Sequence, residues 1–325
     1  MAKDDVVGLV VGIAVIGGAA YAIYKGYLGQ AIDAILKGDF KLPDLGGGDT
    51  GGGGTDTGGG GSSGGGGDTP SGAGIKFAAA GDWGSGRNKN WEKVVAGMKK
   101  ENVSVVLVPG DMSYTNVGGF KPVTDAIKAI PAKVLGAQGN HDGSEYASLF
   151  DAYSNSVTTI GNVSFMSLNS NSTGSAVSYA KANMSKMTAK WKVVFFHHPV
   201  YTVKSNHGAT MQSIQPELAG KVDLCIAAHN HNYQRFEPIA GVTHIISGLG
   251  GEGPYGVGAY SGTPANAKKY NSTFGFVVLT TTDTNMSGKF IDVSDKVIDT
   301  FTITKPAAAM AHAFTTRFRP KRLHW

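Results

Sequence analysis

Residues 103–114 read Val-Ser-Val-Val-Leu-Val-Pro-Gly-Asp-Met-Ser-Tyr, an apolar run followed at once by a polar loop. The run is nearly continuous and rich in β-branched residues, which is typical of a short strand buried on both faces. The glycine after it predicts a tight loop that carries Asp111 and Tyr114 to the carboxyl end of the strand, where open α/β sheets bind their ligands. Both side chains are hard oxygen donors, and a phenolate suits trivalent iron better than zinc or magnesium. One such loop is most often only a turn, so the prediction depends on the other strand ends.

Four other predicted strands end in polar loops of the same kind. Because parallel strands bring their carboxyl ends to one edge of a sheet, the side chains of these loops would converge there. The whole set is too rich in oxygen for a structural zinc site and suits two ions about 3.5–4 Å apart. The residues at these five strand ends that can bind metal are Asp82, Asp111, Tyr114, Asn140, His141, His197, His229 and His231.

Strands and helices alternate over the first part of the predicted head, which favours a largely parallel sheet. The expected strands are 75–80, 103–109, 132–137, 191–196, 222–228 and 242–247, with helices at 91–98, 123–130, 178–189 and 211–218. Gly161-Asn162 predicts a hairpin. The last strands, 274–281, 289–293 and 297–304, are expected to pair antiparallel in a second sheet packed on the first.

The formal net charge is +5, and the end of the chain supplies all of it. The segment from residue 305 onward has no acidic residue and five basic ones, Lys305, Arg317, Arg319, Lys321 and Arg322. The rest of the chain is near neutral and has no repeat of basic and aromatic residues, so no nucleic-acid partner is expected. The single cysteine, Cys225, lies in an apolar run and is interpreted as a buried, inert thiol.

The first 74 residues differ in composition from the rest. Residues 6–24 are apolar over about the ~20 residues that a helix needs to cross a bilayer, which predicts a membrane anchor. A signal peptide cleaved near Ala22 is the alternative, although the start lacks the positive charges of such peptides. The Gly/Ser/Thr/Asp-rich stretch that follows predicts a flexible linker with an end-to-end distance of about 30 Å. The predicted organisation is an anchor helix with a short amphipathic segment at 1–45, the linker at 46–74, a globular domain at 75–305 and a basic, disordered tail at 306–325.

The motifs of the globular domain resemble those of the purple acid phosphatases, a branch of the calcineurin-like metallophosphoesterases. In chain order they are Gly81-Asp82-x-Gly84, Gly110-Asp111-x-x-Tyr114, Gly139-Asn140-His141-Asp142, Val194-x-x-His197 and His229-x-His231. The resemblance covers about residue 75 to the Gly-rich loop near Gly253, looks like the small single-domain type, and implies a four-layer α/β/β/α sandwich of two mixed sheets. Related phosphodiesterases carry a histidine where Gly84 stands here, and Tyr114 offers the missing ligand, which favours the purple branch. The family's glycine before His-x-His is Ala228 here; alanine would cost about 1 kcal/mol if that position needs positive φ.

The resemblance also implies a role for each residue. A ferric ion would be held by Asp82, Tyr114 and His231, and a divalent Fe, Zn or Mn by Asn140, His197 and His229, with Asp111 between them. A metal-activated hydroxide would attack phosphorus. His141 would contact the phosphate or protonate the leaving group, Asp142 would orient His141, and His207 would be a second phosphate contact or acid.

These residues predict a dinuclear-metal acid phosphatase that hydrolyses phosphate monoesters. Its partners would be small phosphate esters or phosphorylated surface molecules and, through the apolar segment, a membrane. The alternatives are a phosphodiesterase or nucleotide hydrolase on the same site, and a non-catalytic surface or stalk protein. The anchor predicts an extracytoplasmic catalytic domain, or a secreted one after cleavage. Sequons compatible with a glycosylated head lie at Asn102, Asn162, Asn171, Asn183, Asn271 and Asn285.

Overall fold

The computed structural model describes residues 72–84, 89–114, 117–203, 210–257 and 266–305. The predicted anchor, most of the predicted linker, the tail at 306–325 and the candidate residue His207 lie outside these ranges. Within the described ranges, none of the helices is both long enough and apolar enough to traverse a bilayer. The described residues all belong to one structural unit, Ser63–Trp325.

Fourteen described strands form two seven-stranded mixed sheets. The first sheet contains β1 (Lys76–Ala79), β2 (Val105–Val108), β3 (Lys133–Gly136), β4 (Ala152–Tyr153), β12 (Gly275–Thr281), β13 (Asn285–Asp292) and β14 (Val297–Thr304), in the order β14-β13-β12-β1-β2-β3-β4. The second contains β5 (Ser156–Ile160), β6 (Val163–Ser167), β7 (Trp191–Phe195), β8 (Leu224–Ala227), β9 (Tyr233–Phe236), β10 (Thr243–Ser247) and β11 (Asn266–Tyr270), in the order β11-β9-β10-β8-β7-β6-β5. Strands β1 to β4 run parallel, as do β6, β7, β8 and β10, so each sheet has a carboxyl edge that gathers loops.

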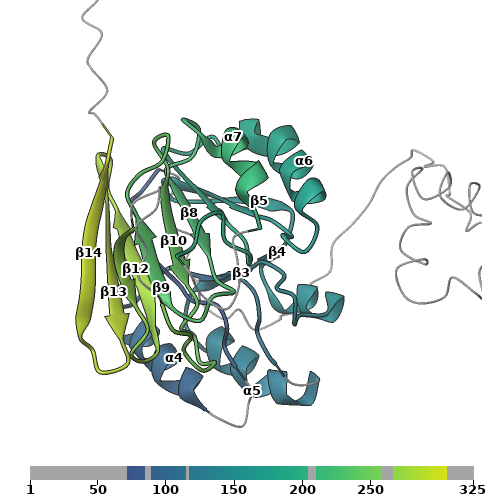
Figure 1. Ribbon diagram of the computed structural model, residues 1–325, viewed down its shortest axis with the longest axis vertical. Helices are drawn as coiled ribbons and strands as arrows, with labels where there is room; N and C mark the ends of the chain where they lie inside the picture. Colours follow the sequence, from purple (N-terminus) through teal and green to yellow (C-terminus); the bar gives the residue numbers. More distant parts are fainter. Residues whose placement is uncertain (1–71, 85–88, 115–116, 204–209, 258–265, 306–325) are drawn as a thin grey trace, which may run out of the picture. The chain divides into compact units, whose positions relative to one another are not determined.

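Helices cover the outer faces of both sheets (Figure 1). The helices are α4 (Asn90–Lys100), α5 (Val117–Lys128), α6 (Thr173–Asn183) and α7 (Gln215–Leu218), with short 3-10 turns at Ser144–Leu149, Met184–Lys186 and Gln212–Ile214. One apolar cluster fills the space between the sheets, a second joins the first sheet to α4 and α5, and a third joins the second sheet to α6 and α7. These four layers confirm the sandwich of two mixed sheets, because each strand offers alternate side chains to the inner and outer clusters.

The strands at the C-terminal end correct one prediction. They do pair antiparallel, but they extend the first sheet, where β12 lies beside β1. The register pairs Phe77 with Leu279, and both side chains enter the cluster between the sheets. The second sheet is built from the middle of the chain, β5 to β11.

Two local predictions also differ from the structure. The helix expected at 178–189 spans Thr173–Asn183, because its buried face consists of Ala176 and Ala180, which give a weak apolar period. Strands β4, β9 and β11 were not expected. The Gly161-Asn162 hairpin, by contrast, is confirmed between β5 and β6.

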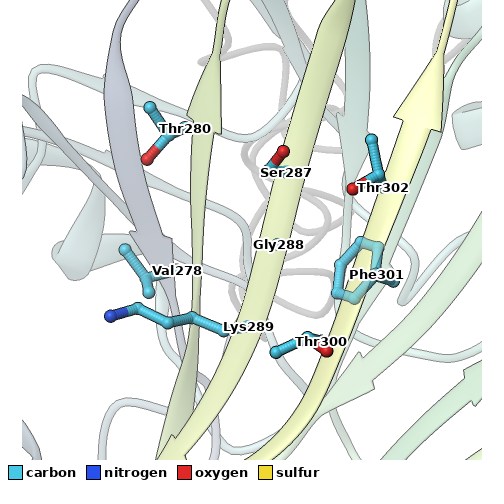
Figure 2. A pocket seen from close by; sticks show the side chains of 8 residues that line it. All are labelled: Val278, Thr280, Ser287, Gly288, Lys289, Thr300, Phe301 and Thr302. Carbon is cyan, nitrogen blue, oxygen red and sulfur yellow. The ribbon is translucent and has the colours of Figure 1, made fainter.

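A shallow hollow of about 450 Å³ lies on the outer face of β12, β13 and β14 (Figure 2). The hydroxyl groups of Thr280, Ser287 and Thr302 rise from three neighbouring strands around it. The register pairs Thr280 with Lys76, so the hollow lies toward the amino end of β1 and away from the carboxyl edge that gathers the candidate residues.

Candidate metal centre

All the described candidate ligands lie in loops that directly follow the carboxyl ends of β1, β2, β3, β7 and β8. We call these loops the metal edge; they comprise residues 81–84, 110–114, 139–142, 197–198 and 229–231. Three of them come from the first sheet and two from the second. The site is therefore formed where the two sheets meet, and neither sheet alone would hold all the donors.

The backbone of the metal edge is strained at three candidate ligands. Asp82 has φ 58°, Asp111 has φ 52° and His229 has φ 69°, although none of them is glycine. A side chain in this left-handed region costs about 1–2 kcal/mol, and such strain accumulates at functional sites. Position 228 is not among the positive-φ residues, so the alanine that departs from the family pattern carries no conformational cost there.

The loops also approach one another unusually closely. A Cβ added at Gly139 would lie 2.1 Å from Oδ1 of Asp111, and one added at Gly248 would lie 2.5 Å from Oδ2 of Asp82. Both glycines are therefore required by the packing of the two carboxylates. Gly248 belongs to the Gly-rich loop after β10, which closes one side of the centre.

One half of the centre is formed by Asp82, Tyr114 and His231. The Tyr114 hydroxyl lies 2.9 Å from Oδ1 of Asp82 and 2.7 Å from Nε2 of His231. His231 directs Nδ1 to the carbonyl oxygen of Gly253 at 3.0 Å, an acceptor that fixes a proton on Nδ1 and leaves Nε2 with a lone pair. The phenol therefore has one proton for two acceptors.

The other half is formed by Asp111, Asn140, His197 and His229. Nδ1 of His197 lies 3.0 Å from the carbonyl oxygen of Pro109, so Nε2 carries the lone pair in the neutral ring. That Nε2 lies 3.0 Å from Oδ1 of Asn140, 3.2 Å from Oδ2 of Asp111 and 3.1 Å from Nδ1 of His229. In the neutral ring, Nε2 of His197 and the oxygens of Asn140 and Asp111 are therefore all acceptors, and a bound cation would satisfy them together.

The pKa values of the buried acidic groups and of His197 are shifted by burial and by one another's charges. Burial raises the pKa of Asp82 well above its usual range. Burial alone would lower the pKa of His197, but the Asp111 carboxylate outweighs it and raises that pKa to about 9. Burial would likewise raise the pKa of Asp111, but the His197 charge holds it well below its usual range. A protein that keeps these groups together binds protons where a metal would sit.

A test of metal fit comes from the polar atoms themselves. Oδ2 of Asp82 is buried and makes no hydrogen bond of good geometry in the described part of the chain. Asp82, Asp111 and His197 offer atoms that lie within 4.8 Å of one another, and so do His197, His198 and His229. An orphaned buried carboxylate oxygen beside crowded lone pairs fits two ions that share Asp111.

Asp142 makes contacts that the sequence did not predict. Its Oδ2 accepts from the backbone N–H groups of Asp111 and Gly139, and Oδ1 accepts from that of Met112, each at 2.8 Å. The carboxylate therefore clamps the loop after β2 to the loop after β3. Burial raises the pKa of Asp142 to about 6.

His141 is exposed at the mouth of the centre. Its ring lies 4.3 Å from the Tyr114 ring, and its backbone N–H donates to Oδ1 of Asp111 at 2.9 Å. This places an imidazole next to both halves while leaving it open to solvent. His207, the other predicted phosphate contact, lies outside the described residues.

Sequence reasoning missed two residues that hold the ligand rings. The ring of Tyr255 stacks on His231 at 3.8 Å and 15°. Ser170 is buried, and its Oγ lies 3.0 Å from Nδ1 of His198 and accepts from the backbone N–H groups of His197 and His198. The Gly-rich run before Tyr255 was a visible signal of a loop near the site, whereas no sequence pattern marks Ser170.

The centre can now be compared with known proteins. Residues 75–233 match the family model of the calcineurin-like phosphoesterases. Among curated proteins of Arabidopsis thaliana, purple acid phosphatase 7 is 30% identical over 38% of this chain and 38% of its own length, and purple acid phosphatase 21 is 26% identical over 54% of this chain and 50% of its own. The chain therefore spans half or less of the length of these relatives.

A solved structure shares the fold at lower identity. GAP50, described as the anchor in the inner membrane complex of Plasmodium, superposes with a TM-score of 0.59 at 20% identity, over 72% of this chain and 90% of the other. Residues 75–233, which match the calcineurin-like phosphoesterase model, contain all five loops of the metal edge. The chain therefore carries a calcineurin-like metallophosphoesterase domain.

Proposed function

We propose that the chain is a dinuclear-metal acid phosphatase that hydrolyses phosphate monoesters. The observation that carries the proposal is the convergence of seven donors from five loops into two halves with too few protons to satisfy their lone pairs. A site of this kind is stable only around positive charge, and the family supplies a chemistry that uses two ions for phosphate esters.

The residues of each half favour different ions. Asp82, Tyr114 and His231 would hold a ferric ion, because a phenolate and a carboxylate are hard ligands. Asn140, His197 and His229 would hold a divalent Fe, Zn or Mn, and Asp111 would contact both. When bound, the two ions supply the positive charge that holds a phosphate ester and activates water for attack.

The protein's own groups then position the reaction. Asp111 contacts His197 through Oδ2 and the backbone N–H of His141 through Oδ1, so it joins the loop after β3 to the loop after β7. The exposed His141 ring has room to donate a hydrogen bond to a phosphate oxygen or the leaving oxygen. Asp142 keeps both loops in register through three backbone hydrogen bonds.

Visible absorption tests the iron assignment directly. Purified protein loaded with iron should be violet to pink through a phenolate-to-iron band, should contain two metal ions, and should hydrolyse p-nitrophenyl phosphate at acidic pH. Tyr114→Phe should lose the band, and the matched control Tyr201→Phe should keep it. Iron-loaded protein without colour and without activity would remove the proposal.

Two alternatives are separated by simple comparisons. A phosphodiesterase or nucleotide hydrolase would prefer bis(p-nitrophenyl) phosphate or a nucleotide to the monoester. An anchoring role without catalysis is the second candidate, because the Plasmodium protein of similar fold is described as an anchor. Against it, none of the seven predicted ligand positions is replaced by a residue unable to bind metal.

A membrane-anchored, extracytoplasmic setting, or secretion after cleavage, is part of the same proposal, and it rests on residues 1–45 alone. Glycosylation of the head is proposed only for some sequons. Asn162 is 3% exposed and its amide nitrogen donates to the Thr282 carbonyl oxygen, so this sequon is a structural asparagine. Asn102 is exposed and available. Mass analysis of protein from a glycosylating host would separate the two.

A further inference from the structure

Both ends of the described chain leave the sandwich at the same place. At the start, the N–H of Gly72 donates to the Gly161 carbonyl oxygen, and the N–H of Asn162 donates to that of Ala73. At the end, the N–H of Lys305 donates to the Thr284 carbonyl oxygen. The two sites adjoin, because Thr282 accepts from the side chains of both Asn162 and Trp191, and Lys305 lies over the Trp191 ring at 4.9 Å.

This place is opposite the metal edge. Ile75 precedes β1 and Asp82 follows it, so the chain crosses the sheet between the two. At about 3.3 Å per residue, that crossing separates them by roughly 20 Å. Trp191 and Asp223 likewise lie at the amino ends of β7 and β8, whose carboxyl ends carry His197 and His229. The chain therefore enters and leaves at the amino edge, behind the centre.

A lysine-lined hollow of about 550 Å³ opens at this amino edge. Its lining residues are Met184, Ser185, Lys192, Gly220, Lys221, Val222, Asp223, Gly241 and Lys305. We call these residues, with the exposed Lys186 and Lys190 nearby, the lysine end. The acidic member, Asp223, is already engaged by Lys305 at 2.8 Å and by the backbone N–H of Lys192 at 2.8 Å.

Positive charge thus exceeds negative charge at the lysine end. Lys221 pairs with Glu217 at 3.5 Å, an exposed contact that solvent weakens, and Lys192 and Lys305 line the same opening. Farther along the sequence, residues 306–325 contain Arg317, Arg319, Lys321 and Arg322 and no acidic residue. Clusters of four to eight basic residues beside a membrane-spanning segment are typical of binding to anionic lipid, which lies in the cytoplasmic leaflet. Docking of this kind would therefore replace the extracytoplasmic setting proposed above with a cytoplasmic one.

We propose that the lysine end docks on an anionic phospholipid bilayer, with the metal edge facing away from it. The occupant is a bilayer rather than a nucleic acid, because the end of the chain that leaves here at Gly72 leads back to the apolar residues 6–24. Docking would fix the orientation of the described domain relative to the bilayer. If the proposed phosphatase function holds, its substrates are then soluble esters or phosphorylated groups beyond the membrane, not the headgroups beneath it.

Vesicle flotation of the full chain tests the docking. Neutral phosphatidylcholine vesicles report binding through the apolar segment, and vesicles with about 30% phosphatidylserine add the electrostatic part. Lys192→Gln with Lys221→Gln should lower the phosphatidylserine-dependent increment about 10–25-fold, at about fivefold for each lysine near the surface. The matched control, Lys93→Gln with Lys121→Gln, removes two lysines from α4 and α5, one of them in an i,i+4 ion pair as Lys221 is.

Equal increments for both double variants, or an increment that survives 1 M salt, would overturn the docking surface. Neither outcome depends on catalysis, so a failed phosphatase assay leaves this test intact. A preference for RNA over vesicles that the same lysines abolish would also overturn the bilayer assignment.

A second measurement tests the orientation. Cys225 is the sole cysteine and is 2% exposed, so an introduced surface thiol can be labelled selectively. A fluorophore at Ser185→Cys, at the lysine end, should be quenched by headgroup-borne quenchers. One at Ser175→Cys, in the first turn of α6 beside the metal edge, should not be quenched. Equal quenching at both positions would contradict the fixed orientation.

Discussion

The metal edge and the amino edge lie on opposite sides of one sandwich and satisfy their polar groups in different ways. At the metal edge, candidate ligands take positive φ and lone pairs face one another. At the amino edge, Asn162 accepts from the Thr281 hydroxyl at 2.6 Å and donates to the Thr282 carbonyl oxygen, which also accepts from the Trp191 indole at 2.7 Å. One edge therefore carries backbone strain and crowded polar atoms, while the other joins the two sheets by hydrogen bonds.

This contrast predicts that substitutions at the two edges separate activity from stability. Removing a charge from the metal edge should abolish function without unfolding the metal-free protein. Removing a hydrogen bond from the amino edge should unfold the protein without changing the chemistry. Active sites that hold unsatisfied groups commonly show this trade-off.

The largest effect is expected from Asp82→Asn. The change removes a ligand, so the protein should lose at least one of two metal ions, and kcat/KM for a monoester should fall about a thousandfold or more, equivalent to several kcal/mol. Urea unfolding in a chelator should show little or no loss of stability, because burial already raises the pKa of this carboxyl and its Oδ2 has no good partner. The exposed control Asp283→Asn should change neither quantity. An Asp82→Asn protein with two ions and full activity would show that Asp82 is not a metal ligand.

The next effect concerns His244, the second residue of β10. It is buried, its Nε2 has no hydrogen-bond partner in the described residues, and burial lowers its pKa to about 3 from an ordinary 6.5. The unfolded chain binds the proton first as the pH falls, so stability is complete above about pH 6.5 and declines down to pH 3. The pKa difference corresponds to about 5 kcal/mol by pH 3 and about 2 kcal/mol at pH 5.

His244→Leu should remove this loss, because leucine binds no proton. Urea unfolding between pH 4 and pH 7, in a chelator, measures it. At pH 7 the variant should be as stable as the original or slightly more so, since an unsatisfied polar atom is gone. An unchanged dependence on acid would show that the acid-labile groups lie at the metal edge instead.

A smaller effect is expected at the amino edge from Trp191→Phe. The ring is fully buried and most of its packing survives, but the Thr282 carbonyl oxygen loses its indole donor. The free energy of unfolding should fall by about 1–3 kcal/mol, read as a lower midpoint in urea. Metal content and kcat should stay unchanged. A fall in kcat with unchanged stability would reverse the roles assigned to the two edges.

The sequence predicted the metal edge better than it predicted the rest of the fold, and the reason is physical. Ligand chemistry restricts which residue types can follow a strand, so Asp82, Asp111 and His229 were visible one motif at a time. The pairing of β12 with β1 joins residues about 200 positions apart, and no local pattern shows which sheet a strand will enter. Residues that hold the ligands, such as Ser170 and Tyr255, act through contacts that only the folded chain creates.

The smallest effect, and the sharpest test of how rigid the metal edge is, comes from Tyr255. Its ring stacks on His231 at 3.8 Å and 15°, and its backbone N–H donates to the His231 carbonyl oxygen. Tyr255→Leu removes the stack and should weaken the metal at the Tyr114 half about tenfold, as loss of a supporting contact does elsewhere. Tyr255→Phe keeps the ring and should restore affinity, which separates stacking from the hydroxyl. A metal titration followed by the absorption band distinguishes them, and equal losses in both variants would mean that the hydroxyl, not the ring, holds His231 in place.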